Sequence, residues 1–215
     1  MENGRVLRGE LLFKHPFSMI VGGASASGKT EWVRRFIQHH RQLIEPSVEQ
    51  VLYCYGVFNP TVLDLQRKGV DTMLGLPTEA QVRNRNGPLL LILDDLMIEA
   101  KSDFLDLLFT RGCHHWGVSV VFVTQNLFEK SLKTARNNAH YIVLLRNPSG
   151  QLQIRNLGTQ LFPRQLDYFM DAYKKATAQH YGYLLIDMHP KSRELLRLRT
   201  HIFPDEQQHL FIPVG

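Results

Sequence analysis

One stretch of the sequence constrains the possible folds more than any other. It consists of Gly23, Ala24, Ser25, Ala26, Ser27, Gly28, Lys29 and Thr30. The stretch satisfies the pattern G-x-x-x-x-G-K-[ST] at each constrained position. Glycines at both ends allow the backbone to curl, so that successive N–H groups point into one concavity and can donate to phosphate oxygens. Lys29 would add charge for the β- and γ-phosphates of a nucleotide, and the Thr30 hydroxyl would lie near Mg²⁺. The alternative is a glycine-rich turn that only joins a strand to a helix.

The residues on either side of this loop favour the nucleotide-binding interpretation. Residues 16–21 have the apolar composition of a short buried strand. Val33, Phe36, Ile37 and His40 then follow at the i, i+3, i+4, i+7 spacing of a helix face. A helix that begins directly after the loop directs the positive end of its dipole toward a bound anion. We therefore predict a strand, a phosphate-binding loop and a helix in that order.

Length and composition predict one globular unit. The chain has 215 residues, of which 44% are hydrophobic, so it can bury a full core. We expect a single domain over residues 1–215, with residues 1–15 as a lead-in segment at its edge and residues 181–204 as C-terminal strands. The formal charge of +5 permits a polyanionic partner without requiring one.

Cysteine and histidine usage argues against a disulfide framework and against a zinc site. Cys54 and Cys113 are the two cysteines of the chain. Of the ten histidines, four form adjacent pairs at residues 39–40 and 114–115, whose side chains diverge on a regular helix, and no Cys/His cluster has zinc spacing. We find no signal peptide and no apolar run long enough to span a bilayer. These features predict a reducing compartment, cytoplasm or nucleus, and no membrane partner.

Strands and helices alternate along the chain. Strands are expected at residues 50–55, 70–76, 88–93, 118–123, 141–145, 183–186 and 196–200. Helices are expected around residues 62–66, after residue 103 with Phe104, Leu107 and Leu108 on one side, and at residues 149–160 and 163–178. This alternation predicts an α/β fold with a largely parallel sheet, whose ligands gather at the carboxyl ends of the strands.

Two acidic residues follow the most apolar of these runs. Asp94 and Asp95 come directly after residues 88–93, where a protein with a phosphate-binding loop needs a carboxylate for Mg²⁺. Asp94 is the candidate for that role, and Asp95 is the candidate general base that orients an attacking water. Asp95 is one methylene shorter than the glutamate usual in this role. The alternative is a plain Asp-Asp turn after a strand.

Gln125 ends the next apolar strand, in the sequence Val-Thr-Gln-Asn at residues 123–126. If that strand lies beside the Asp94 strand, the amide reaches the γ-phosphate region and can donate to it or to water. Gln125 is therefore a candidate nucleotide sensor. The alternative is a polar strand end that is exposed to solvent.

Together these motifs resemble the FtsK–HerA superfamily. The likeness rests on residues 23–30, on Leu-Leu-Ile-Leu-Asp-Asp-Leu at residues 90–96, and on His-His-Trp-Gly-Val-Ser-Val-Val-Phe-Val-Thr-Gln-Asn at residues 114–126. It continues through residues 141–148, 181–187 and 196–203, so it covers about residues 15–204. Within the superfamily the chain most resembles the poxvirus-type virion genome-packaging ATPases of adintoviruses and Polinton/Maverick elements.

This resemblance implies a RecA-like (ASCE) P-loop NTPase fold with a C-terminal strand pair. It implies ATP and Mg²⁺ as cofactors, double-stranded DNA as substrate, a homo-oligomeric ring, and a capsid vertex or other virion protein as partner. The protein would be virus-encoded and act in the host nucleus or cytoplasm or with the virion. Its expected activity is ATP-driven translocation of DNA into a preformed capsid.

The sequence departs from the family at the arginine finger. Relatives often carry one just before the glutamine strand, where this chain has His114 and His115, with Arg111 one helical turn earlier. Arg111 is the first candidate for a finger supplied in trans, followed by Arg136 and Arg146. The alternative for Arg111 is a solvated helix end.

A row of basic residues follows Gln125. Lys130, Lys133 and Arg136 are three apart, so they lie roughly on one face of a helix, where they could contact DNA phosphates. A solvated helix face explains the row equally well, and Arg83 and Arg85 are the rival DNA contacts.

Other interpretations of the whole chain are an ATP-switched assembly or transposition helper with little turnover and a nucleotide kinase. A GTPase is disfavoured because the chain has no Asn-Lys-x-Asp motif.

Overall fold

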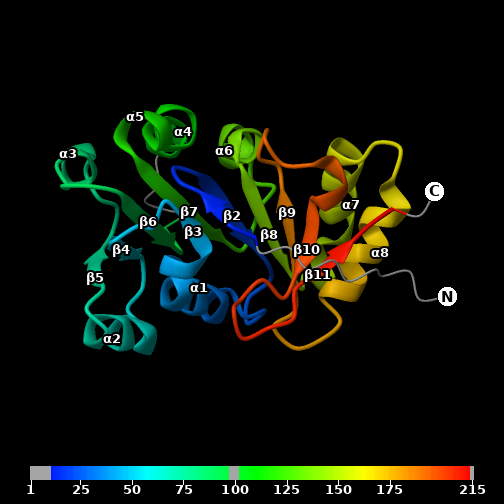
Figure 1. Cartoon of the computed structure of the whole chain (residues 1–215), viewed down its shortest axis with the longest axis horizontal. Coiled ribbons are helices and arrows are strands. Elements are labelled where there is room, and N and C mark those ends of the chain that lie inside the picture. The colour runs from blue at the N-terminus through cyan, green and yellow to red at the C-terminus, as the bar shows by residue number, and fades with distance from the viewer. Residues whose placement is uncertain (1–10, 97–101, 214–215) are drawn as a thin grey trace.

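Parallel strands form the centre of the protein. The computed structural model describes residues 11–96 and 102–213, and within these ranges a nine-stranded sheet has the order β11-β10-β9-β8-β2-β7-β6-β4-β5 (Figure 1). The strands are β2 (Ser18–Gly22), β4 (Gln50–Tyr55), β5 (Asp71–Leu74), β6 (Leu89–Asp94), β7 (Val118–Thr124), β8 (Tyr141–Leu145), β9 (Tyr183–Asp187), β10 (Leu198–Thr200) and β11 (His209–Phe211). The strands from β8 to β5 are parallel, whereas β9, β10 and β11 join in antiparallel pairs.

Helices connect the strands and cover both faces of the sheet. The helices are α1 (Lys29–Leu43), α2 (Pro60–Arg67), α3 (Glu79–Arg83), α4 (Ser102–Leu107), α5 (Cys113–Trp116), α6 (Lys133–Asn138), α7 (Gln151–Leu161) and α8 (Leu166–Ala176). A π-helical segment, η1 (Leu108–Gly112), joins α4 to α5, and 3₁₀ turns occur at η2 (Lys130–Leu132), η3 (Pro148–Gly150) and η4 (Glu194–Leu196). In the described part of the chain no helix combines the length and apolarity that a bilayer span requires.

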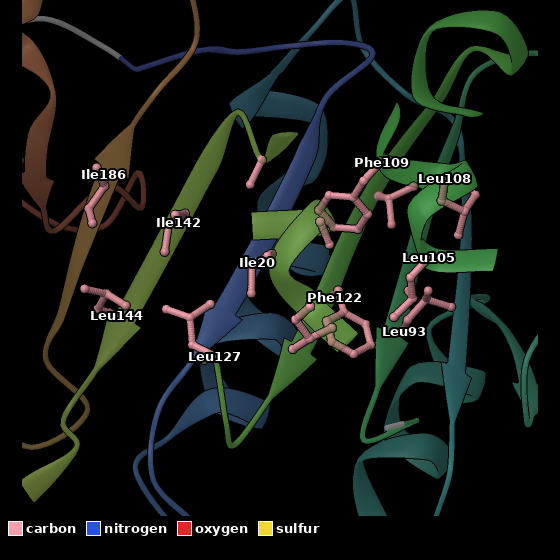
Figure 2. Packing of buried hydrophobic residues seen from close by; sticks show 14 of the residues in the cluster. Ile20, Leu93, Leu105, Leu108, Phe109, Phe122, Leu127, Ile142, Leu144 and Ile186 are labelled. Atoms are coloured by element: carbon pink, nitrogen blue, oxygen red, sulfur yellow. The ribbon is translucent and has the colours of Figure 1, made fainter. Parts of the chain in front are cut away.

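Alternate residues of each central strand pack into two separate cores. Leu91 and Leu93 of β6 face the core formed with α3 to α8, and Leu90 and Ile92 face the core formed with α1 and α2. Figure 2 shows the first core, in which strand residues such as Phe122 lie against helical residues such as Leu105. Because both faces of β6 are covered, its sequence is continuously apolar up to Asp94.

The predicted fold class is confirmed, including a C-terminal antiparallel pair, β9 and β10. The structure corrects several boundaries. The expected strand at residues 196–200 begins only at Leu198, because residues 194–196 form a 3₁₀ turn. Strand β11, helix α3 and the small β1–β3 pair (Phe13–Lys14 with Ile44–Glu45) were not predicted. Each has five residues or fewer, which is too short for a periodic hydrophobic pattern to develop.

Two segments pack differently from the sequence prediction. In the helix after residue 103, Leu105 and Leu108 are buried, whereas Phe104 and Leu107 are only half-buried. The π-helical segment that follows α4 changes the rotation of the chain, so a regular helical period is the wrong template there. In the lead-in segment, of which residues 1–10 lie outside the described part, Phe13 is fully buried and packs edge-on against Phe36 of α1.

Candidate nucleotide site

The loop between β2 and α1 has a backbone that depends on its glycines. Gly28 has φ of 101°, and a Cβ atom there would lie 2.4 Å from the ring of Tyr181. At Gly23 a Cβ would lie 2.7 Å from Ser27 Oγ and 2.8 Å from the Leu145 side chain. Helix α1 begins directly after the loop, since Trp32 N–H donates to the Gly28 carbonyl. The loop is thus a tight concavity at a helix N-terminus, the geometry that favours anions.

Lys29 lies inside this concavity. Its ammonium donates to the carbonyls of Gly23 and Ala24, at 2.9 and 2.6 Å. Burial lowers the pKa of Lys29, and the charges of Asp94 and Asp95 oppose that shift. The lysine is therefore held in the loop while still facing the two carboxylates.

Strand order brings the separate motifs to one place. Strand β7 lies between β2 and β6 in parallel register, with Thr124 opposite Gly22 and Val123 opposite Asp94. Because parallel strands end at the same edge of the sheet, the loop, the two aspartates and Gln125 meet there. They enclose a cavity of about 200 Å³ that is lined by Ser25, Ala26, Lys29, Thr30, Tyr55, Val57, Asn59, Asp94, Asp95, Val123, Thr124 and Gln125. We refer to it as the phosphate cavity.

Asp94 is held by a buried tyrosine. The carboxylate is 7% exposed, and the hydroxyl of Tyr53, on the neighbouring strand β4, donates to Asp94 Oδ2 at 2.5 Å. Burial raises the pKa of Asp94, whereas the bond from Tyr53 lowers it. Burial and the carboxylate together raise the pKa of the Tyr53 phenol, so the phenol remains protonated. Tyr53 thus stabilises the ionised carboxylate and engages one of its two oxygens.

Asp95 reaches the cavity through an unusual backbone. It has φ of 55°, in the left-handed region, and its side chain is exposed along the cavity wall. The chain after β4 approaches it closely, because Gly56 N–H donates to the Asp94 carbonyl at 3.1 Å and a Cβ at Gly56 would lie 2.4 Å from the Asp95 carbonyl oxygen. The lack of a side chain at Gly56 therefore allows the chain after β4 to pass close to the Asp95 backbone.

The residues of this cavity fit Mg²⁺. The Thr30 hydroxyl and the Asp94 carboxylate both line it, and oxygen donors of this kind are the ligands that Mg²⁺ takes in proteins. The hydrogen-bond donor on Asp94, a phenol, is neutral, so it leaves the negative charge of the buried carboxylate in place. Such a carboxylate is suited to a cation nearby.

Tyr53, Tyr55, Val57 and Asn59 belong to the site but to none of the predicted motifs. Asn59 caps helix α2 by accepting from Thr61 N–H, and it lines the phosphate cavity as well. The Asn-Pro dipeptide at residues 59–60 is a helix-start signal that could have indicated this position. The two tyrosines read as strand core residues, and only the pairing of β4 with β6 brings them to Asp94.

The candidate arginine fingers do not line this cavity. Arg111 is exposed in η1, which precedes β7, so it lies toward the opposite edge of the sheet from the loop of its own chain. Arg146 follows β8, and its carbonyl accepts from Ala24 N–H. Arg136 donates to the Leu127 carbonyl at 2.9 Å and lies 5.1 Å from the Phe128 ring centroid. Among the lining residues in the described ranges, Lys29 is the single cation.

The basic row after Gln125 is only partly continuous. Lys130 lies in the 3₁₀ turn η2 and Lys133 begins α6, and both are exposed. Arg136 is half-buried by its contacts with residues 127–128, so the row presents two exposed lysines rather than three exposed cations on one helix. The rival arginines carry partners, since Arg83 pairs with Glu79 and Arg85 with Asp71.

Comparison with known proteins supports the fold. No family model and no curated protein sequence matches the chain. Among solved structures, B204, the DNA-packaging ATPase from Sulfolobus turreted icosahedral virus, is 12% identical with a TM-score of 0.55, over 94% of this chain and 100% of that one. The genome-packaging NTPase B204 from Sulfolobus turreted icosahedral virus 2, in complex with ATPγS, is 14% identical with a TM-score of 0.52, over 80% of this chain and 93% of that one.

A third similar structure is the cytoplasmic domain of the type VII secretion ATPase EccC from Thermomonospora curvata. It is 16% identical with a TM-score of 0.54, over 92% of this chain and 26% of that one. At these identities the likeness shows the fold, which is that of the RecA-like P-loop ATPases. The structural neighbours include viral genome-packaging NTPases, in agreement with the resemblance that the sequence motifs indicate. The relation to adintoviruses and Polinton/Maverick elements stays a prediction.

Proposed function

We propose that this protein is an Mg²⁺-dependent ATP hydrolase that translocates double-stranded DNA into a preformed capsid as a ring of identical subunits. The observation that carries the proposal is the convergence of the phosphate-binding loop, Asp94, Asp95 and Gln125 on one small cavity. The fold is shared with packaging NTPases that bind ATP analogues, which supports the choice of nucleotide. The protein would be virus-encoded, act in the host nucleus or cytoplasm or with the virion, and dock on a capsid vertex or another virion protein.

Each residue has a distinct role in this proposal. The loop N–H groups and Lys29 hold the phosphates, and Thr30 and Asp94 would hold Mg²⁺, which supplies charge neutralisation on the β- and γ-phosphates when bound. Asp95 would accept a proton from the attacking water, and Gln125 would orient that water or the γ-phosphate. The Tyr53 hydroxyl donates to Asp94 and so favours its ionised form against the effect of burial, which raises the pKa of the carboxyl.

A ring of subunits would supply the arginine that the phosphate cavity of a single subunit lacks among its described lining residues. Phosphoryl transfer is accelerated by an arginine near the γ-phosphate, and Lys29 is the one cation among the described residues that line this cavity. Arg111 is exposed toward the other edge of the sheet, so it could reach only the cavity of a neighbouring subunit. A head-to-tail ring repeats that contact at every interface.

Steady-state ATP turnover with and without duplex DNA tests the proposal. We expect hydrolysis that DNA stimulates several-fold. Lys29→Ala should abolish this hydrolysis, because it removes the positive charge that contacts the β- and γ-phosphates. Lys68→Ala is a matched control, since Lys68 is exposed on the surface after α2 and pairs with Asp64. Binding of ATP and DNA without turnover would favour the assembly or transposition helper. Turnover that survives in folded Lys29→Ala protein would overturn the site assignment.

Mixed rings test the role of Arg111. Arg111→Ala subunits and Lys29→Ala subunits should each be inactive, and mixing them should restore part of the activity. The reason is that some interfaces then pair an intact loop with an intact arginine. Subunit exchange is checked with two fluorescent labels. Exchange without recovery at any ratio would exclude Arg111 as a trans finger and direct attention to Arg146 and Arg136.

A further inference from the structure

A second and larger cavity lies on the other side of the phosphate-binding loop. It has a volume of about 650 Å³ and is lined by Arg146, Pro148, Gln151, Met170, Asp171, Tyr173, Lys174, Thr177 and Ala178. These residues come from the end of β8, from η3 and the start of α7, and from α8 with the two residues after it. The volume is within the range of small-molecule sites in proteins. None of its lining residues lines the phosphate cavity.

Contacts at the end of β8 and after α8 join the walls of this cavity to the phosphate-binding loop. The Arg146 carbonyl accepts from Ala24 N–H, which joins the end of β8 to the loop. The Tyr173 hydroxyl donates to the Leu145 carbonyl at 3.2 Å and accepts from Asn147 N–H at 3.0 Å, which joins α8 to the same strand end. After α8, the Tyr181 ring lies against Gly28. The cavity walls and the loop are therefore one connected structure.

Strand order determines which way a bound nucleotide extends. The loop follows β2, with β7 and β6 on one side and β8 on the other. Asp94, Asp95 and Gln125 line the phosphate cavity on the β7 and β6 side, so the terminal phosphate of a bound nucleotide would lie there. A nucleotide that crosses the loop from that end must place its other end on the β8 side, where the second cavity lies.

The walls suit a nucleoside. Pro148, Met170 and Ala178 present apolar surface that can cover the faces of a planar base. Gln151 and Lys174, both exposed at the rim, can hydrogen bond to base edges and ribose hydroxyls. We propose that this cavity binds the base and ribose of the nucleotide whose phosphates the loop holds. The inference rests on the proposed nucleotide binding, and it assigns the second half of the ligand to residues that no sequence motif marks.

The test compares ATP with inorganic tripolyphosphate, which lacks base and ribose, by calorimetry on the full chain in Mg²⁺ buffer. ATP should bind the wild-type protein at least about tenfold more tightly than tripolyphosphate. Ala178→Trp, which fills the cavity from an exposed position, should weaken ATP about tenfold and leave tripolyphosphate within about twofold. Ala80→Trp is the matched control, because Ala80 is an exposed alanine of α3 near the β5 edge of the sheet. It should change neither affinity.

Photolabelling gives a second measurement that does not depend on a variant. 8-Azido-ATP should label peptides that contain residues 146–151 or 170–178. Equal affinities of wild-type protein for ATP and tripolyphosphate, or labelling confined to other segments, would overturn the inference while the phosphate site stands. Failure of the wild-type protein to bind either compound would overturn the proposed function, and the inference with it.

Discussion

The two cavities beside the phosphate-binding loop are built in different ways. The phosphate cavity takes its candidate catalytic groups, Lys29, Asp94, Asp95 and Gln125, from short motifs at the carboxyl ends of β2, β6 and β7. The cavity beside β8 takes its walls from α7, α8 and the strand end, through contacts between residues up to 28 positions apart. Phosphate chemistry needs particular residue types at particular positions, whereas a surface for a base needs only shape and apolarity. The first is therefore visible in a sequence and the second is not.

The largest expected difference between the two cavities is the one between variants of Gln125 and Gln151. Gln125→Ala removes an amide that would donate near the γ-phosphate, so turnover should fall by about 10² while ATP affinity stays within a few-fold. Gln151→Ala, in the other cavity, should do the reverse and weaken ATP binding with turnover at saturation nearly unchanged. Measurements of kcat and of ATP affinity for both variants separate the two roles. Equal losses of binding and turnover in Gln125→Ala would make Gln125 structural.

The sequence predicts the central strands well because they are buried on both faces. Such strands read as continuous apolar runs, as at residues 89–93 and 118–123, and their polar ends mark the edge where ligands bind. Strand neighbours and register are not encoded in such runs. The placement of Gln125 beside Asp94 was a conditional expectation that the pairing of β6 with β7 confirms.

Residues whose role depends on tertiary contacts escaped prediction. Tyr53 reads as a core aromatic, and its bond to Asp94 exists only because β4 pairs with β6. Arg136 has the right spacing to extend the basic row, but the turn at residues 127–128 supplies a carbonyl and an aromatic ring that hold its guanidinium. Local spacing places a residue on a helix face and does not show which neighbouring segment meets that face.

A second prediction concerns the bond between Tyr53 and Asp94. Tyr53→Phe removes the group that offsets burial, so the pKa of the Asp94 carboxylate should rise further above its ordinary value. Activity requires the ionised carboxylate. In a plot of turnover against pH, the loss of activity on the acid side should therefore begin at a higher pH than in the wild-type protein. Turnover at limiting Mg²⁺ should fall about tenfold, as expected for losing one hydrogen bond to a charged group.

The control for that variant is Tyr141→Phe. Tyr141 is equally buried, but its hydroxyl accepts from Lys14 N–H near the amino end of β8, away from the phosphate cavity. It should leave the loss of activity on the acid side and the Mg²⁺ requirement unchanged. Superimposable profiles for Tyr53→Phe and the wild-type protein would show that the buried carboxylate is held without the phenol.

The smallest expected effect concerns the cavity beside β8. Tyr173→Phe removes the hydroxyl that joins α8 to Leu145 and Asn147, which should cost about 1 kcal/mol of unfolding free energy and lower the Tm by roughly 2–4 °C. Since those contacts position the cavity against the loop, ATP affinity should fall about two- to threefold while tripolyphosphate affinity stays constant. Tyr168→Phe is the matched control, because it lies on the same helix and its hydroxyl donates to the Phe211 carbonyl instead. It should lower the Tm by a similar amount and leave the ratio of the two affinities unchanged. If both variants changed that ratio equally, the effect would reflect general loosening of α8, and the contact between Tyr173 and the end of β8 would have no special part in nucleotide binding.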